Sequence, residues 1–302
     1  MRLDNGPTTD EQILGQFIPL IYHYNMLQDE DRIFAFRDAI ELIVKPGMHV
    51  LELGGGTGIL SSFAARRGAR VTCVERNPAL VACARQFLHD NSMDDAVEVI
   101  LNDAAEFVPD SPVDVVICEM LHVGLLRERQ AQVIAAFKRR YMATHGPKLP
   151  TFIPEASILM VQPVRQCFEF AGYTAAVPMF QAPRTQQPRT IESASLSPYA
   201  NIAYDDFIPQ SFDVSQTIEV HTSGVINAIR FVTQNVLGID VPKQRAITWP
   251  NQCLVLPIKN AVEAIAGQRI RTSFAYPAGG SVEELAESIA VEICESVKVS
   301  AA

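Results

Sequence analysis

The sequence predicts an α/β fold in the first half of the chain and an all-β second half. In the first half, short apolar segments alternate with helical patterns, which is the rhythm of the βαβ units that build a doubly wound parallel sheet. From Pro150-Thr-Phe-Ile-Pro154 onward, short alternating strand patterns replace them. With 302 residues the chain is long enough for two domains. We therefore expect one domain over residues 1–152 and a second over residues 153–302.

Each element of the first half has its own local signal. Residues 12–43 have a helical pattern that Pro19 interrupts, and Pro46-Gly47 ends this region. Asn77-Pro78 is typical of a helix start, with asparagine as the cap and proline at the first helical position. Buried parallel strands are expected at residues 48–53, 70–75, 97–101 and 113–119, and further helices at 59–67 and 125–140.

The second half shows strand patterns without helical ones. Strands are expected at residues 157–162, 217–220, 225–232, 253–256, 269–274 and 289–294. Residues 172–209 are rich in Pro, Ala, Ser, Thr and Gln, which fits a loop, a linker or a protruding arm.

Composition and charge argue against several classes of protein. The net charge of -9 argues against nucleic-acid binding, which relies on basic patches, and it is compatible with a cationic substrate. Six cysteines without a CxxC pair indicate neither a zinc site nor a disulfide framework. No apolar run approaches the ~20 residues of a membrane helix, and the first residues lack an apolar signal segment. We expect a cytoplasmic protein with reduced thiols, without a metal and without a nucleic-acid or membrane partner.

A glycine-rich turn follows the first expected strand. Glu52-Leu-Gly54-Gly-Gly56-Thr-Gly58 lies where a strand turns into a helix, and glycines let the backbone turn tightly and approach a ligand closely. The dinucleotide fingerprint is GxGxxG, whereas Ile59 stands where its third glycine would be. The GxGxG spacing resembles motif I of class I methyltransferases that use S-adenosylmethionine (SAM). A structural turn without a ligand is the alternative interpretation.

Acidic residues end the next two expected strands. Glu75 ends the second strand, at the usual position of an acid that hydrogen-bonds ribose hydroxyls. Asp103, followed by Ala104, ends the third strand, where methyltransferases of this superfamily contact adenine. Together with the glycine turn, these positions predict a SAM site.

Two glutamates, Glu119 and Glu128, bracket the segment after the fourth expected strand. A guanidinium is planar and cationic and presents its N–H donors as a fork, so two convergent carboxylates would bind it and orient one terminal nitrogen. A carboxylate beside that nitrogen would polarise it and accept its proton. Alternatively, Glu128 belongs to a solvated helix face, Arg127-Glu128-Arg129. The position of Glu119 at a strand end beside the expected cofactor favours the first interpretation for the pair.

The sequence resembles the protein arginine methyltransferases over most of its length. Four segments carry the resemblance: residues 23–32, close to the family's His-Glu-Glu-Met-Leu-x-Asp-x-x-Arg segment; residues 51–69, close to its motif I; the double-glutamate segment 119–128; and Ile247-Thr248-Trp249, at the place of its Thr-His-Trp loop.

The resemblance implies specific roles for residues. Residues 23–32 would form a helical lid over SAM, with Arg32 pairing with the methionine carboxylate and His23 and Met26 lining the pocket. For Met26, core packing is equally compatible with the sequence. Trp249 would wall the substrate pocket, although ordinary core burial is the alternative. The resemblance also implies a β-barrel or β-sandwich as the second domain, a dimerisation arm within residues 172–209, and a homodimer.

Three departures separate this chain from the family pattern. Thr248 replaces the histidine of the Thr-His-Trp loop, and residues 13–17 lack the family's tyrosines. The double-glutamate segment reads Met120-Leu-His122-Val-Gly124, where eukaryotic members usually have Trp-Met-Gly-Tyr. His122 would contact the substrate and replace a missing base, or it is a loop histidine. These changes suggest a divergent member, with free arginine or another guanidino metabolite as an alternative to a protein arginine.

The expected activity is therefore SAM-dependent N-methylation of a guanidino nitrogen. Two other readings of the sequence stay open. One is a SAM-dependent N- or O-methyltransferase of a non-guanidino small metabolite on the same scaffold. The other is a non-enzymatic partner that kept the fold, which the intact glycines and Glu75 disfavour.

Overall fold

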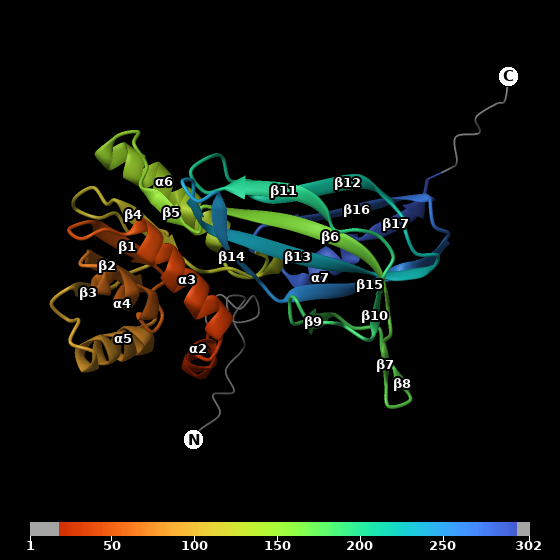
Figure 1. The fold of residues 1–302 in the computed structure, drawn as a ribbon, viewed down its shortest axis with the longest axis horizontal. Coiled ribbons are helices and arrows are strands. Elements are labelled where there is room, and N and C mark those ends of the chain that lie inside the picture. The colour runs from red at the N-terminus through yellow and green to blue at the C-terminus, as the bar shows by residue number, and fades with distance from the viewer. Residues whose placement is uncertain (1–17, 295–302) are drawn as a thin grey trace.

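A parallel sheet forms the first part of the molecule. The computed structural model describes residues 18–294, and Figure 1 shows the two parts side by side along the longest axis. The parallel strands lie in the order β3-β2-β1-β4-β5. Their bounds are β1 His49–Leu53, β2 Arg70–Glu75, β3 Val97–Leu101, β4 Val115–Cys118 and β5 Thr151–Ile153. β1 and β4 are buried along their whole length, as expected for central strands covered on both faces.

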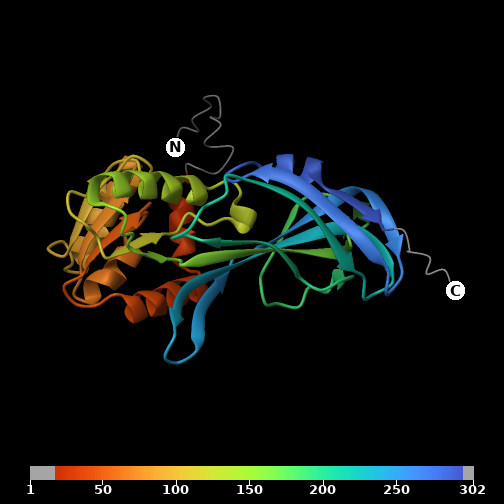
Figure 2. The ribbon, with the colours of Figure 1, turned by 90° about the horizontal axis from the view of Figure 1, so that it is seen from above.

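Helices cover both faces of this sheet. They are α2 Leu20–Met26, α3 Glu30–Ile43, α4 Ile59–Arg66, α5 Pro78–Asp90 and α6 Gln130–His145. Figure 2 shows α6 on one side of the sheet and the first helices of the chain on the other. This is the outcome of right-handed crossovers that move outward from β1 in both directions. The expected doubly wound sheet is confirmed.

Two helix expectations in the first part need correction. The helix expected over residues 12–43 is divided: residues 12–17 lie outside the described part, Pro19 precedes α2, and a turn at residues 27–29 separates α2 from α3. The helix expected from residue 125 begins only at Gln130. Leu125 and Arg127 have positive φ angles of 53° and 59°, which a right-handed helix excludes.

Antiparallel strands form two sheets and a separate two-stranded hairpin in the second part. The larger one has the order β10-β6-β13-β15-β9, with β11 beside β6 and β14 beside β13. Its strands are β6 Ala156–Gln166, β9 Met179–Gln181, β10 Thr190–Glu192, β11 Ser197–Ala203, β13 Gly224–Asp240, β14 Arg245–Pro250 and β15 Cys253–Ala264. The smaller sheet consists of β12 Ser211–Glu219, β16 Arg269–Pro277 and β17 Ala290–Ile293. Within residues 18–294 neither sheet closes on itself, so the expected barrel is not confirmed.

The second part is not entirely β. A short helix, α7 (Val282–Ser288), lies between β16 and β17, and the Ser281 side chain accepts a hydrogen bond from the Glu284 backbone N–H. The Ser-x-x-Glu pattern at this point is the signature of a helix start that the sequence analysis missed. Within residues 172–209, β9, β10 and β11 belong to the larger sheet. The hairpin of β7 (Glu169–Phe170) and β8 (Tyr173–Thr174) extends away from the body of the molecule (Figure 1).

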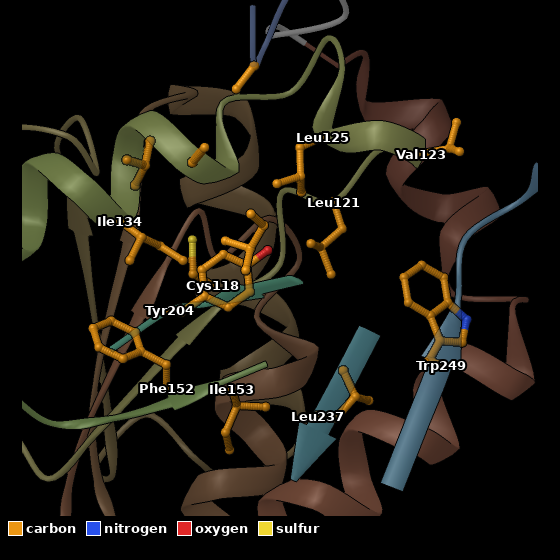
Figure 3. Packing of buried hydrophobic residues seen from close by; sticks show 14 of the residues in the cluster. Cys118, Leu121, Val123, Leu125, Ile134, Phe152, Ile153, Tyr204, Leu237 and Trp249 are labelled. Atoms are coloured by element: carbon orange, nitrogen blue, oxygen red, sulfur yellow. The ribbon is translucent and has the colours of Figure 1, made fainter. Parts of the chain in front are cut away.

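A single apolar core joins the two parts. β13 has 17 residues, and its C-terminal half lies against α3 of the first part, as β14 does. Phe36 on α3 contacts Trp249 on β14 edge-on, with 6.1 Å between the ring centres. Figure 3 shows part of this shared core, to which Ile153 of the first part and Leu237 of the second both belong. No helix within residues 18–294 has the length and apolar character needed to cross a membrane.

Candidate active site

A cleft with a volume of about 550 Å³ opens at the carboxyl ends of β1, β2, β3 and β4. Ligands of doubly wound sheets bind at this edge, and pockets for small molecules have volumes of roughly 300–1,000 Å³. Of the residues singled out in the sequence, all but Gly58 line the cleft: His23, Met26, Arg32, Glu52, Gly54, Gly56, Glu75, Asp103, Ala104, Glu119, His122, Glu128 and Trp249.

The glycine turn forms the floor of the cleft. Gly54, Gly56 and Gly58 have φ angles of 76°, 54° and 78°, which other residues adopt only at a cost. At Gly55 a Cβ atom would lie 2.1 Å from the Cys73 sulfur, so the strand β2 leaves no room for a side chain. Gly58 does not line the cleft. It allows close helix packing, because a Cβ atom there would touch Leu88 on α5.

Two buried glutamates hold the turn in place. Glu75 accepts hydrogen bonds from the backbone N–H groups of Gly56 (2.9 Å) and Asn77 (2.8 Å). Glu52 accepts hydrogen bonds from the backbone and the hydroxyl of Ser61 at the start of α4. Burial raises the pKa of Glu52 to about 7. Both side chains therefore shape the turn as well as lining the cleft.

Asp103 and Ala104 line the cleft at the end of β3. The Asp103 carboxylate accepts a hydrogen bond from the Ala105 backbone N–H at 2.8 Å and lies 3.9 Å from the Arg76 guanidinium. These contacts fix a carboxylate beside Glu75 at the same edge of the sheet.

α2 covers the glycine turn from the opposite side. The His23 ring lies directly over Gly56, whose Cβ position would be 3.1 Å from the ring Nδ1. Burial, and then the charge of Arg32, lower the pKa of His23 to about 4, so its ring is neutral at neutral pH. The Met26 carbonyl accepts a hydrogen bond from Arg32 Nη1 at 3.2 Å.

The Arg32 guanidinium contacts a carboxylate of the protein itself. Its Nη2 and Nε atoms donate to Glu119 Oε2 at 2.6 and 3.0 Å, and both side chains are about one-tenth exposed. This contact was not foreseen in the sequence, where Arg32 was expected to serve the cofactor alone.

Glu119 and Glu128 lie on the two sides of a loop that contains the short 3-10 helix η1 (Val123–Leu125). Glu119 directly follows β4, and Glu128 precedes α6 by one residue. Desolvation, and then the charge of Glu119, raise the pKa of Glu128 to about 8, while Arg32 and Arg127 act in the opposite direction. The two carboxylates thus interact across the same part of the cleft, and a cation between them would relieve their repulsion.

The fully buried Gln130 holds the backbone on either side of Glu119. Its amide donates to the Cys118 carbonyl at 2.7 Å, and its carbonyl accepts from the Met120 N–H at 2.9 Å. No pattern in the sequence indicated this role, because a glutamine at a helix start usually faces solvent.

Aromatic and amide side chains of the second part line one end of the cleft. His122 contacts Phe180 of β9 edge-on, with 5.8 Å between ring centres, and burial lowers the pKa of His122 to about 4. Such a low pKa makes His122 a weak base. Trp249 is 9% exposed, lines the cleft and packs in the core. Phe180, Asn251 and Gln252 also line the cleft and were not foreseen.

The cleft suits SAM. It combines a glycine turn that admits a ligand to the backbone with carboxylates at the ends of β2 and β3 that can accept hydrogen bonds from ribose and adenine. Within residues 18–294, no cluster of three or more His, Cys, Asp or Glu residues has the arrangement of a metal site.

Comparisons with known proteins agree with this geometry. Residues 50–143 match the methyltransferase domain family. An uncharacterised protein of Methanothermobacter thermautotrophicus is 29% identical over 89% of this chain and 97% of its own length. The arginine N(omega)-methyltransferase of Streptomyces achromogenes subsp. streptozoticus is 33% identical, but the match covers only 46% of this chain and 40% of that protein.

Two solved structures share the fold at low sequence identity. The Trypanosoma brucei PRMT1 enzyme–prozyme heterotetrameric complex with AdoHcy has a TM-score of 0.68 at 20% identity, covering 90% of this chain and 96% of that chain. Protein arginine methyltransferase 10 of Arabidopsis thaliana has a TM-score of 0.70 at 16% identity, covering 86% of this chain and 89% of that chain. This chain is a class I SAM-dependent methyltransferase that resembles the protein arginine methyltransferases.

Proposed function

We propose that this methyltransferase methylates a terminal nitrogen of a guanidino group that Glu119 and Glu128 hold at the acceptor end of the cleft. The observation that carries the proposal is the pair of interacting carboxylates beside the glycine turn, both lining one cleft. A guanidinium placed between them would meet an acceptor for each edge of its fork.

The residues of the chain would act on the acceptor in three ways. Glu119, fixed by Arg32, would accept N–H bonds from the guanidinium and set its plane. Glu128 would polarise the reacting nitrogen and take up the proton that the nitrogen loses. Phe180, His122 and Trp249 would exclude water from this end of the cleft. Bound SAM supplies the electrophilic methyl group.

A second candidate is methyl transfer to a neutral small metabolite. One observation favours it: Arg32 already compensates Glu119, and a Glu128 with a pKa of about 8 is mostly protonated at neutral pH. The acceptor end would then have little net negative charge, which suits an uncharged nitrogen or oxygen nucleophile.

Mass spectrometry separates the two candidates. The protein would be incubated with SAM and, in parallel, with free arginine, an arginine-rich peptide and a cell extract. We expect a methylated guanidino group that disappears in Glu119→Gln, whereas Asp213→Asn on the exposed face of β12 serves as a matched control with unchanged activity. Methylation of only non-guanidino metabolites, or full guanidino activity in Glu119→Gln, would contradict the proposal.

We also propose that two copies of the chain associate. The exposed aromatic residues Phe34 (46%) and Phe87 (37%) border a second cleft of about 440 Å³ over α3, α4 and α5, and the β7–β8 hairpin bears an exposed Tyr173 (72%) that would fit such a surface. Light scattering would detect the dimer, and we expect Phe87→Asp to convert it to a monomer. A monomeric wild-type protein at micromolar concentration would rule the dimer out.

A further inference from the structure

The loop between the two glutamates has a strained backbone. Gly124, Leu125 and Arg127 have φ angles of 68°, 53° and 59°, although only the first is a glycine. Left-handed backbone at residues with a Cβ atom is unfavourable and persists only where the surroundings hold it. Arg127 precedes Glu128 directly, so the conformation of this loop determines where the Glu128 carboxylate lies.

Three side chains of the second part bind the backbone of this loop. Thr233 Oγ1 accepts a hydrogen bond from the Gly124 N–H at 2.8 Å, and the Tyr276 hydroxyl donates to the Gly124 carbonyl at 2.9 Å. The Asn251 amide donates to the Leu121 carbonyl at 3.0 Å. These side chains come from β13, β16 and the residues after β14, so distant segments converge on one loop.

Backbone groups of the second part also form hydrogen bonds with the part of the loop that lies next to Glu128. The Gly279 N–H donates to the Leu125 carbonyl, and the Arg127 N–H donates to the Gly280 carbonyl, both at 2.8 Å. The loop side chains Leu121, Val123 and Leu125 are also buried in the core, and Figure 3 shows Leu121 and Leu125 beside each other in its interior.

Two of these side chains, Asn251 and Tyr276, have further hydrogen bonds of their own. Asn235 donates to Asn251 at 2.8 Å and accepts from the Ser157 hydroxyl at 2.7 Å. The Tyr276 hydroxyl also contacts the Tyr199 hydroxyl at 2.6 Å. Buried polar side chains that are hydrogen-bonded to one another form a rigid network. The placement of the second part therefore determines the placement of the loop.

We propose that Thr233, Asn251 and Tyr276 are positioning residues, through which the second part sets the relative placement of Glu119 and Glu128. The inference rests on the proposed function of the two glutamates. A misplacement of about 1 Å at a catalytic group can reduce turnover about 100-fold. Removing one of these hydrogen bonds should therefore impair transfer, whereas SAM binding at the far end of the cleft should persist.

The test compares isosteric variants with matched controls. Thr233→Val and Tyr276→Phe each delete one hydroxyl that binds the loop. Thr72→Val deletes a buried hydroxyl bonded to His49, and Tyr141→Phe deletes one that contacts the Val113 backbone, and neither touches the loop. Thr233→Ser keeps the hydroxyl. For each variant, kcat and KM for the methyl acceptor, SAM affinity by calorimetry, and hydrogen exchange of residues 119–129 would be measured.

We expect Thr233→Val and Tyr276→Phe to lower kcat about tenfold or more, to change SAM affinity less than about threefold, and to increase exchange across residues 119–129. Thr233→Ser should recover activity, and the two controls should keep it. The inference would be overturned if kcat fell no further in these variants than in the controls, or if hydrogen exchange in the loop stayed unchanged. If the wild type methylates no guanidino group, the proposed function fails, and the exchange data still decide whether these residues hold the loop.

Discussion

Arg32 and Glu119, which are 87 residues apart in the chain, form a buried ion pair in which two N–H groups of the guanidinium meet one carboxylate oxygen at 2.6 and 3.0 Å. Arg32 lies in the first turn of α3, on the lid side of the cleft, whereas Glu119 lies at the end of a central strand. The pair joins the side that covers the cofactor to the side that would hold the acceptor. If Arg32 also contacts the methionine carboxylate of SAM, one side chain serves both ligands.

The two-donor geometry of the Arg32 guanidinium should affect turnover more than its positive charge does. We expect Arg32→Lys to lower kcat/KM for the acceptor by about 10- to 100-fold, because a lysine ammonium cannot place two parallel donors on Glu119. Arg37→Lys, on the exposed face of the same helix, is the matched control. Steady-state kinetics of both variants at saturating SAM would measure the effect. Equal activity of Arg32→Lys and wild type would show that turnover does not depend on the two-donor geometry of the guanidinium.

Activity should rise with pH through the pKa of Glu128. In the free protein this pKa is about 8, so below pH 8 most molecules hold a protonated Glu128 that is a poor partner for a cation. A guanidinium does not titrate in this range. We expect kcat/KM for the acceptor to increase from pH 6.5 to about 9 and then to level off. A flat profile would favour the neutral acceptor.

The pH profile needs one control, because the pKa of Glu52 lies near 7. Glu52 lines the cofactor end of the cleft, so its ionisation should appear in the SAM dissociation constant. Calorimetry of SAM binding across the same pH range therefore separates the two carboxyl groups.

Glu128 should also make stability fall as pH rises. An unfolded glutamate has a pKa of about 4.3, so between about pH 4.3 and pH 8 the folded chain binds a proton that the unfolded chain has released. The free energy of unfolding therefore decreases with rising pH across this window. Glu128→Gln lacks the titration, and we expect its melting temperature to exceed that of the wild type by about 2–4 °C or more at pH 8.5, with a smaller difference at pH 5.5. Parallel differences at both pH values would mean that Glu128 is not desolvated.

The sequence predicted the cleft residues around the glycine turn better than those that hold the loop between Glu119 and Glu128. Glu75 and the glycines could be located because strand ends and glycine turns are local patterns that converge at one edge of a parallel sheet. Glu119 was found by the same argument. Four of the five strands of the parallel sheet were predicted for the same reason, as their alternation with helices is local, whereas the short β5 was missed.

The residues that hold the acceptor loop could not be found in this way. Thr233, Asn251 and Tyr276 contact a segment more than 100 residues away in the chain, and nothing in a strand pattern shows which carbonyl a buried hydroxyl will meet. The late start of α6 has a similar cause. The helical periodicity continues through Leu125, and only contacts with the second part hold Leu125 and Arg127 at positive φ.

Glu75 should contribute to SAM affinity through its carboxylate and through the turn. We expect Glu75→Ala to weaken SAM binding by ~1.5–3 kcal/mol, the range for hydrogen bonds to charged groups. Its loss also leaves the Gly56 and Asn77 N–H groups without their acceptor. Glu98→Ala, an exposed glutamate on β3, controls for loss of charge. Calorimetry that finds unchanged SAM affinity in Glu75→Ala would refute the ribose assignment.

Gly55 should tolerate a side chain only if Cys73 is shortened. A Cβ atom at residue 55 would lie 2.1 Å from the Cys73 sulfur, which is fully buried in β2. Gly55→Ala should therefore displace the turn, reduce SAM affinity and lower the free energy of unfolding by ~1–3 kcal/mol, the range for overpacked cores.

A double-mutant cycle with Cys73→Ala tests that cause directly. The φ angle of Gly55 is not in the left-handed region, so alanine itself fits the backbone once the sulfur is gone. We expect the double variant to bind SAM more tightly, and to unfold at a higher temperature, than Gly55→Ala alone, with a coupling free energy of ~1–2 kcal/mol between the two sites. Additive losses would mean that Gly55 is required for its backbone freedom or for direct approach to the ligand, and that the close contact with β2 is not what excludes a side chain from the turn.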